Sequence, residues 1–121
     1  MKQEHKELLL KDLCARLPYG VKVESVFINP DTKERKPCGI EVFDATCLLM
    51  IRDGLGEFKP YLFPLSSMTE EQSLEYLRTC MGGNASIPTL ASYDWLNKNY
   101  FDYRGLIPMG LANNAVGLNI Y

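Results

Sequence analysis

Residues 21–31, VKVESVFINPD, decide the fold expected for this chain, because a β-branched run leads there into a strong turn. The run over residues 21–28 is typical of a strand. Its apolar alternation passes through Val21 and Val23 and then slips to Val26 and Ile28. We therefore expect a β-bulge near Ser25. Asn29-Pro30-Asp31 has the chemistry of a tight turn, so this stretch predicts one strand of a sheet and the reversal that follows it.

The residues that follow predict three further strands. After a polar tip at 32–36, residues 39–43 look like the returning strand of a hairpin. Residues 46–52 are the most apolar stretch of the chain and predict a central strand that is buried on both faces. Turn residues at 53–56 lead to a strand over 57–63, which Pro60 and Pro64 should make an edge strand or an irregular one. Short connections favour antiparallel pairing, so a four-stranded antiparallel meander is expected.

Helices are predicted before and after these strands in the sequence. The first covers residues 4–17, and its buried stripe is expected to consist of Leu9, Leu10, Leu13, Cys14 and Leu17. The second follows a capping box at Ser67-Met68-Thr69-Glu70 and reaches about Met81. The third covers about 89–100. The predicted buried faces are Leu74, Leu77 and Met81 on the second helix and Leu90, Tyr93, Leu96 and Tyr100 on the third.

The fold class predicted from these elements is α+β. An N-terminal helix precedes the antiparallel four-stranded meander, and the C-terminal helices pack on one face of it. Residues 1–121 are expected to form a single globular domain, since this length is typical of one domain. Residues 108–121 are compatible with a short helix, a terminal strand or coil.

The composition argues against several classes of function. The net charge is −2, and acidic residues interrupt the only dense basic cluster, at Lys33, Arg35 and Lys36. Binding to nucleic acid is therefore unlikely, because such proteins usually carry a basic face. The longest wholly apolar run, Cys47 to Ile51, is far shorter than the roughly 20 residues that a membrane span needs. We expect a protein that neither inserts into a membrane nor binds nucleic acid.

The ionisable residue types offer little chemistry. Cys14, Cys38, Cys47 and Cys80 have irregular spacing and no CxxC pair, which favours free thiols, a reducing cytoplasmic setting and no metal site. The single histidine, His5, lies near the N-terminus. No phosphate-binding glycine motif is complete, so no cofactor is predicted. No catalytic residue can be named, and an enzyme is the less favoured reading.

One segment near the C-terminus carries an unusual density of aromatic residues. Trp, Tyr and Arg are enriched at binding hot spots, so this segment predicts a patch that binds another protein. The competing interpretation is that these aromatic side chains complete the core, with Arg104 paired to Asp102 or Asp94. The candidate patch consists of Trp95, Tyr100, Phe101, Asp102, Tyr103 and Arg104.

Three stretches give the chain a family resemblance. They are residues 6–20, KELLLKDLCARLPYG; residues 59–71, KPYLFPLSSMTEE; and residues 94–107, DWLNKNYFDYRGLI, which GLA follows at 110–112. Together they resemble a family of short, uncharacterised proteins of phages, prophages and mobile elements of gut bacteria. The resemblance implies an accessory role in phage or mobile-element biology, and it implies no catalytic residue.

Two function classes follow from these observations. The favoured one is a small cytoplasmic accessory protein, associated with a phage or mobile element, that binds another protein. The alternative is a small enzyme or ligand-binding domain that uses carboxylates and tyrosines in a cleft. The tail after Arg104 has no charged residue over its 17 positions, so it could also mediate a homo-oligomer.

Overall fold

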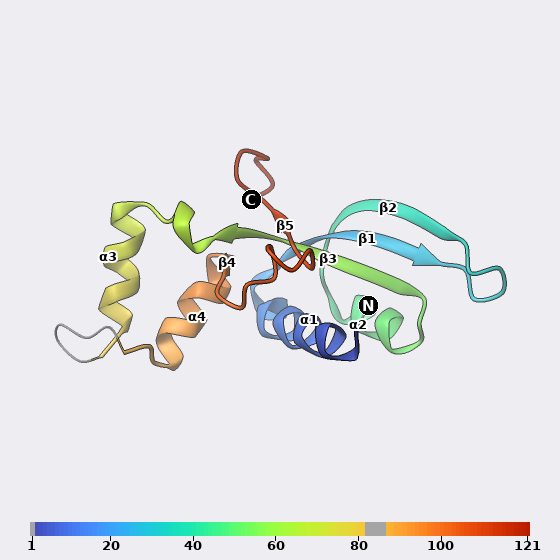
Figure 1. Cartoon of the computed structure of the whole chain (residues 1–121), viewed down its shortest axis with the longest axis horizontal. Coiled ribbons are helices and arrows are strands. Elements are labelled where there is room, and N and C mark those ends of the chain that lie inside the picture. Colours follow the sequence, from blue (N-terminus) through green and yellow to red (C-terminus); the bar gives the residue numbers. More distant parts are fainter. Residues whose placement is uncertain (1, 82–86) are drawn as a thin grey trace.

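The computed structural model describes residues 2–81 and 87–121. Figure 1 shows an elongated molecule in which a long sheet lies above two helices, while a pair of helices forms one end. The helices are α1 (Gln3–Arg16), α2 (Ala45–Arg52), α3 (Glu70–Thr79) and α4 (Leu90–Lys98), with short 3₁₀ turns at Leu17–Tyr19 and Leu65–Ser67. The strands are β1 (Lys22–Ile28), β2 (Arg35–Val42), β3 (Gly56–Pro64), β4 (Phe101–Asp102) and β5 (Asn113–Asn114).

The sheet is mixed, so the fold is α+β but the predicted antiparallel meander is not observed. The strand order is β2-β1-β3-β4, and β5 also pairs with β3. The β1–β2 and β1–β3 pairs are antiparallel. β3 pairs with β4 and β5 in parallel, because long connections bring the C-terminal residues back to it in the same direction.

The irregularity predicted near Ser25 is present, but the extra residue does not lie on the strand where it was expected. The register between β1 and β2 shifts between Ser25 and Val26, where Gly39 and Pro37 are the respective partners. The extra residue is therefore Cys38, on the partner strand. Because the insertion lies on β2, β1 keeps a regular alternation that buries Val21, Val23 and Ser25.

The prediction of a central strand over residues 46–52 is wrong, because this segment is helix α2. Asp44 caps the helix: its carboxylate accepts a hydrogen bond from the backbone N–H of Cys47 at 3.1 Å. A short apolar run has no periodicity that separates a strand from a helix, so the local cap decides. The turn at 53–56 consequently joins a helix to β3 rather than two strands of a hairpin.

β3 is the central strand of the sheet, which corrects the expectation that Pro60 and Pro64 would place it at an edge. The bond from Ile28 N–H to the Leu55 carbonyl sets the hydrogen-bonding phase of the β1–β3 ladder. In that phase the backbone groups of Glu57 and Lys59 point toward β1, and the nitrogen of Pro60 points away. The described pairing on that other side of β3 begins only at Tyr61, so Pro60 removes no ladder bond.

Helix α1 covers one face of this sheet together with α2 (Figure 1). Leu13 is buried as predicted, but Leu10 and Cys14 are exposed, so the predicted stripe is only partly correct. Asp12 and Arg16 are buried instead. Two charged side chains are stable there only because they bond to each other and to neighbouring groups. The core between helices and sheet consists of Leu13, Val21, Val23, Phe43, Cys47, Phe58, Leu62, Leu106, Leu111 and Ala112.

The second and third helices exist as predicted, with shorter bounds and different caps. The capping box of α3 is Thr69 with Gln72 rather than the predicted box from Ser67 to Glu70. A second capping box, Thr89 with Ser92, begins α4. The two helices pack on each other at the end of the molecule, beyond β3, and not over a face of the sheet (Figure 1).

The C-terminal tail returns across the sheet rather than extending from it. Ala112 and Ala115 are buried, and the Ala115 N–H bonds to the Leu62 carbonyl at 2.8 Å. The Tyr121 ring stacks on Tyr100 with centroids 3.8 Å apart, and its hydroxyl donates to the Tyr61 carbonyl at 2.7 Å. Residues 108–121 therefore consist of coil and turns around the two-residue strand β5.

No helix in the described parts of the chain combines the length and the apolar character that crossing a bilayer demands.

Candidate functional site

The predicted aromatic patch is largely tied into the fold. Phe101 and Asp102 form β4 and are buried. The Phe101 ring stacks on Trp95 with centroids 5.6 Å apart and planes 7° apart. The two carboxylate oxygens of Asp102 accept hydrogen bonds from the backbone N–H groups of Leu106 and Ile107, each at 2.9 Å. These contacts fix the turn that follows β4.

Arg104 pairs with Asp12, not with Asp102 or Asp94 as predicted. Its Nε lies 3.2 Å from one carboxylate oxygen of Asp12, and Arg16 Nε lies 2.9 Å from the other. The Tyr103 ring lies beside both guanidinium groups, 4.7 Å from Arg104 Cζ and 5.4 Å from Arg16 Cζ. One buried carboxylate thus binds two arginines, which sequence spacing could not reveal because Asp12 and Arg104 are far apart along the chain.

Arg16 completes this cluster through the backbone. Its Nη2 donates to the Phe101 carbonyl at 2.6 Å, and its Nη1 donates to the Leu96 carbonyl at 3.4 Å. The side chain is fully buried. Since a buried charge is stable only when its hydrogen-bonding groups are satisfied, these bonds join α1 to the end of α4. We call Asp12, Arg16, Tyr103 and Arg104 the arginine clasp.

Tyr100 also makes its contacts within the chain. Its hydroxyl donates to the Tyr19 carbonyl, and its backbone has a φ of 63°, in the left-handed region. Four of the six predicted patch residues are half-buried, namely Trp95, Tyr100, Tyr103 and Arg104. Trp95 and Tyr103 adjoin side chains of α3 and α4. Tyr103 packs against Tyr93 with centroids 5.4 Å apart, and Trp95 packs against Tyr76 at 5.8 Å.

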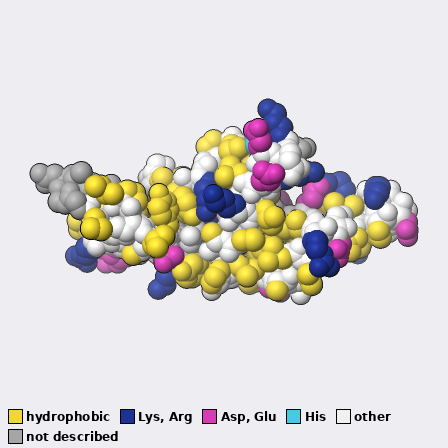
Figure 2. Space-filling view, turned by 90° about the horizontal axis from the view of Figure 1, so that it is seen from below, with side chains coloured by type: hydrophobic (Ala, Val, Ile, Leu, Met, Phe, Trp, Pro, Cys, Tyr) yellow, Lys and Arg dark blue, Asp and Glu magenta, His cyan; other side chains and the backbone are white. Residues whose placement is uncertain are grey.

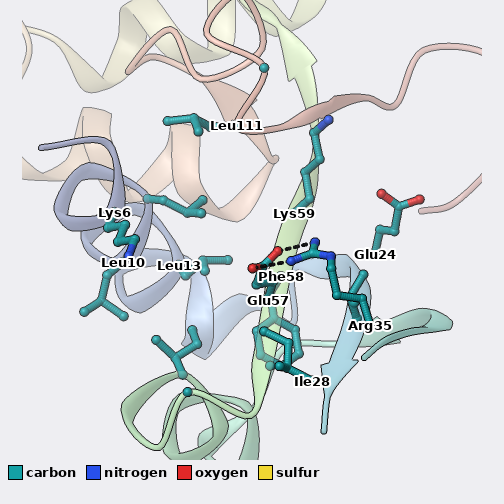
Figure 3. A pocket seen from close by; sticks show the side chains of 16 residues that line it. Lys6, Leu10, Leu13, Glu24, Ile28, Arg35, Glu57, Phe58, Lys59 and Leu111 are labelled. Carbon is teal, nitrogen blue, oxygen red and sulfur yellow. Dashed lines mark hydrogen bonds and ion pairs between the residues drawn. The ribbon is translucent and has the colours of Figure 1, made fainter. Parts of the chain in front are cut away.

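A groove between α1 and the sheet has a volume of about 490 Å³ (Figure 3). Leu10, Leu13 and Phe58 belong to its apolar lining. At its mouth Arg35 forms a two-bond pair with Glu57, as the dashed lines in Figure 3 mark. The hydrogen bond from Arg35 lowers the pKa of the Glu57 carboxyl, so both groups are charged and engaged with each other.

The ionisable lining of this groove consists of lysine, arginine and glutamate side chains. Its ionisable side chains are Lys6, Glu24, Arg35, Glu57 and Lys59. No tyrosine, cysteine or histidine is among the described residues that line it, so the tyrosine-containing cleft of the alternative hypothesis is not found at this groove. No serine, threonine, cysteine or tyrosine lies among the described lining residues, so this set contains no hydroxyl or thiol nucleophile.

The thiols are separated from one another and differ in environment. Cys14 and Cys38 are exposed, Cys80 is half-buried and Cys47 is buried. Burial raises the pKa of the Cys47 thiol to about 11, and the thiol donates a hydrogen bond to the Glu41 carboxylate at 3.3 Å. A thiol that stays protonated is a poor nucleophile. Within residues 2–81 and 87–121, no three His, Cys, Asp or Glu side chains cluster closely enough to hold a metal ion.

The α3–α4 end carries the most conspicuous exposed apolar surface. Leu90 is 84% exposed, Met81 68% and Leu74 57%, although all three were predicted to be buried. Leu77, Ile87 and Tyr93 are exposed as well. Figure 2 shows hydrophobic side chains gathered over this end, on the left of the view. We call Leu74, Leu77, Met81, Ile87, Leu90 and Tyr93 the hairpin face.

Helical spacing groups the exposed side chains of each helix on one side of that helix. Leu74 and Leu77 on α3, and Leu90 and Tyr93 on α4, are each three positions apart and so share a side of their helix. The inward sides are occupied by Tyr76 against Trp95 and by Thr79 against Ser92. Met81 and Ile87 join the two helices through paired backbone bonds of 2.9 and 3.0 Å.

Hydrogen bonds hold the two helices in this arrangement. The Thr89 hydroxyl donates to the Thr79 carbonyl at 2.8 Å, and the Ser92 hydroxyl donates to the same carbonyl at 3.1 Å. The C-terminal end of α3 is thereby bound to the first turn of α4. The sequence pattern correctly marks the apolar stripe of α3, but it was assigned to the core because amphipathic helices usually bury that stripe against their own domain.

Comparison with known proteins adds no relative: no family model, no curated protein and no solved structure matches this chain.

Proposed function

We propose that this chain is a small cytoplasmic accessory protein of a phage or mobile element, and that it binds another protein through the hairpin face. The observation that carries the proposal is the exposure of four apolar side chains on two adjacent helices and of two more, Met81 and Ile87, on the bridge that joins them. Exposed apolar surface of this kind marks interaction sites, because leaving it in water costs free energy. The unpaired cysteines support a reducing compartment, and the family resemblance supports the phage or mobile-element setting.

The chemistry of the face suggests what its partner presents. A surface built from helices with apolar side chains three positions apart fits an amphipathic helix, which inserts its own apolar side chains between them. The charged residues of α3 and α4 are four acids, Glu70, Glu71, Glu75 and Asp94, and two bases, Arg78 and Lys98. The expected partner is therefore an amphipathic helix flanked by basic residues, because opposite charges at the rim speed association and fix orientation.

The predicted aromatic patch contributes to this surface through its outer members. Trp95 packs on Tyr76 of α3, and Tyr103 packs on Tyr93, which belongs to the hairpin face. Phe101 stacks on Trp95, Arg104 donates a hydrogen bond to the Tyr103 hydroxyl, and Asp102 fixes the following turn. Since Trp95 is the single tryptophan of the chain, its fluorescence should respond to a partner that binds the hairpin face.

The test is a titration with two designed helical peptides that share one leucine stripe, one flanked by lysines and one by glutamates. The basic peptide should change Trp95 fluorescence and should bind at least about tenfold more tightly than the acidic one. The variant Leu74→Gln/Leu77→Gln should lose this binding while it keeps its circular dichroism spectrum, because glutamine is a good helix former.

The matched control is Val116→Gln/Leu118→Gln, which changes two side chains of similar exposure in the C-terminal tail. This control should bind the basic peptide as the unmodified protein does. The same variants should then be compared in affinity capture from the native host. The proposal is wrong if Leu74→Gln/Leu77→Gln captures the partner as well as the unmodified protein does. It is also wrong if only Val116→Gln/Leu118→Gln loses the partner.

A further inference from the structure

Strand β2 is an edge strand that its own chain leaves uncovered. It lies at the end of the strand order, and all eight of its residues are exposed. Figure 1 shows the β1–β2 hairpin extending past the helices to the right. Ile40 and Val42, two β-branched residues, are about half exposed. An exposed strand edge presents unpaired N–H and C=O groups to any strand that approaches it.

The hydrogen-bonding phase of the β1–β2 ladder shows which backbone groups of β2 have no partner on β1. Phe43 N–H bonds to the Val21 carbonyl at 2.8 Å, so in the antiparallel ladder Glu41 and Gly39 point their backbone groups toward β1. Ile40 and Val42 point theirs away. The extra residue Cys38 reverses the phase, so that Arg35 and Pro37 point outward on the other half of the strand.

The two halves of β2 differ in how well this edge is protected. Near Arg35 the strand carries Lys36, Pro37 and the bulge, which are common devices against edge-to-edge pairing. From Gly39 to Val42 the strand has neither proline nor bulge, Glu41 is its one charged residue, and the residues whose backbone groups point outward are the apolar Ile40 and Val42. One half of the edge is thus suited to donate hydrogen bonds, while in the other half Pro37 can only accept them.

We propose that two copies of this chain associate by pairing β2 antiparallel with β2 of the second copy, with Val42 opposite Arg35 and Ile40 opposite Pro37. This register brings outward backbone groups of both copies together on both sides of the bulge. The N–H of Ile40 donates to the carbonyl of Pro37, so the missing N–H of proline costs one bond per half-interface. Val42 and Arg35 exchange two bonds. The twofold symmetry repeats each contact.

Charge complementarity selects the same register. It places Lys36 of one copy opposite Glu41 of the other, twice. Both side chains stand on the same face of the sheet, because Lys36 pairs with Phe27 and Glu41 with Val23 within the chain. Among the described residues Lys36 forms no ion pair, and the Glu41 carboxylate accepts a hydrogen bond from the Cys47 thiol. The opposite ends of β2 are therefore complementary to each other when the strand meets its own copy.

This inference concerns β2 and does not depend on the hairpin face, which lies at the other end of the molecule (Figure 1). A peptide that binds the hairpin face would leave the β2 edge open, and a dimer through β2 would leave the hairpin face open. Each proposal can therefore fail while the other stands.

The test is a charge exchange followed by sedimentation velocity over a range of protein concentrations. The unmodified chain should form a dimer. Lys36→Glu and Glu41→Lys should each weaken the dimer by about tenfold or more, since each places like charges opposite each other at both symmetric positions. The double variant Lys36→Glu/Glu41→Lys should restore it. Lys36 and Glu41 lie near opposite ends of β2 and form no ion pair with each other within the chain, so an intramolecular contact does not predict that recovery.

Hydrogen exchange at low and high concentration supplies an independent readout. The amides of Ile40 and Val42 should exchange quickly in the monomer and become protected in the dimer. The amide of Glu41 bonds within the chain and should be protected at both concentrations, which makes it the internal control. A protein that stays monomeric up to millimolar concentration, or a double variant that remains as weak as the single ones, would overturn the proposal.

Discussion

Two regions of the molecule differ in which side chains they bury: one is the sheet together with α1, and the other is the α3–α4 end. Around the sheet the chain buries even charged groups: Asp12 and Arg16 are inaccessible to solvent and bonded to each other. At α3–α4 the chain leaves leucines in water, and α3 contains no buried residue. A domain that can bury an ion pair does not lack core volume. Burying the exposed leucines within the chain would stabilise the monomer, and the proposed partner surface accounts for their exposure.

The largest effect should come from breaking the arginine clasp. Arg16→Met should destabilise the protein by about 3–5 kcal/mol, because it leaves Asp12 and the Phe101 carbonyl without their bonds to this guanidinium. Arg104→Ala should cost less, about 1–2 kcal/mol, because Asp12 keeps Arg16. Urea unfolding followed by circular dichroism measures both. If Arg104→Ala costs more than Arg16→Met, the assignment of the central role to Arg16 is wrong.

The same substitution in both regions sharpens the comparison directly. Leu62→Ala in β3 should cost about 2–5 kcal/mol, because Leu62 is fully buried and a cavity would remain. Leu74→Ala in α3 should change stability by no more than about 0.5 kcal/mol, as at ordinary surface positions. Thermal and urea unfolding of the two variants side by side provide the measurement. A loss above about 1.5 kcal/mol at Leu74 would mean that the hairpin face is covered within the monomer.

Helix α2 gives a smaller and more diagnostic effect. Leu49 is about half exposed on α2, so Leu49→Ala should cost less than about 1 kcal/mol. The central strand predicted from sequence would instead require about 2–5 kcal/mol. Asp44→Ala serves as the companion variant, because it removes the helix cap and should cost about 1 kcal/mol. A large loss at Leu49 with no loss at Asp44 would favour the strand.

The pH dependence at Cys47 should be the smallest effect. Burial raises the pKa of this thiol from about 9 to about 11. Between those pH values the unfolded chain loses the proton that the folded chain keeps, so stability should fall as the pH rises through this window. Cys47→Ala should remove that part of the slope. An unchanged slope in Cys47→Ala would show that another group is responsible.

Much of the fold could be predicted from local sequence, and the exceptions have identifiable causes. Strand β1 follows from its β-branched residues, and α1, α3 and α4 follow from helical periodicity, but the bulge arises from Cys38 on β2 and not from the alternation of β1. α2 was missed because an eight-residue apolar helix and a buried strand have the same pattern, and the cap at Asp44 decides between them. The parallel strands β4 and β5 are two residues long and depend on distant partners, so no local pattern marks them.

The residue types of the candidate site could be predicted from sequence, but which of them are buried and which are exposed could not. The aromatic segment around Trp95 does adjoin the exposed surface, but which of its side chains are buried depends on Asp12, far away in sequence. The stripe of Leu74 and Leu77 was visible as a pattern. The pattern cannot say whether its partner belongs to the same chain, because the hydrophobic effect is the same in both cases.

The bond between Arg16 and the Phe101 carbonyl also has a consequence for the order of assembly. It joins residues 85 positions apart. During synthesis, α1 emerges long before the carbonyl groups that receive its arginine exist, so its charged side must stay hydrated until nearly the whole chain is available. Contacts at such separations slow folding, because the intervening loop must close first. The β1–β2 hairpin can form early from neighbouring residues, whereas docking of α1 is a late event that awaits the arrival of β4.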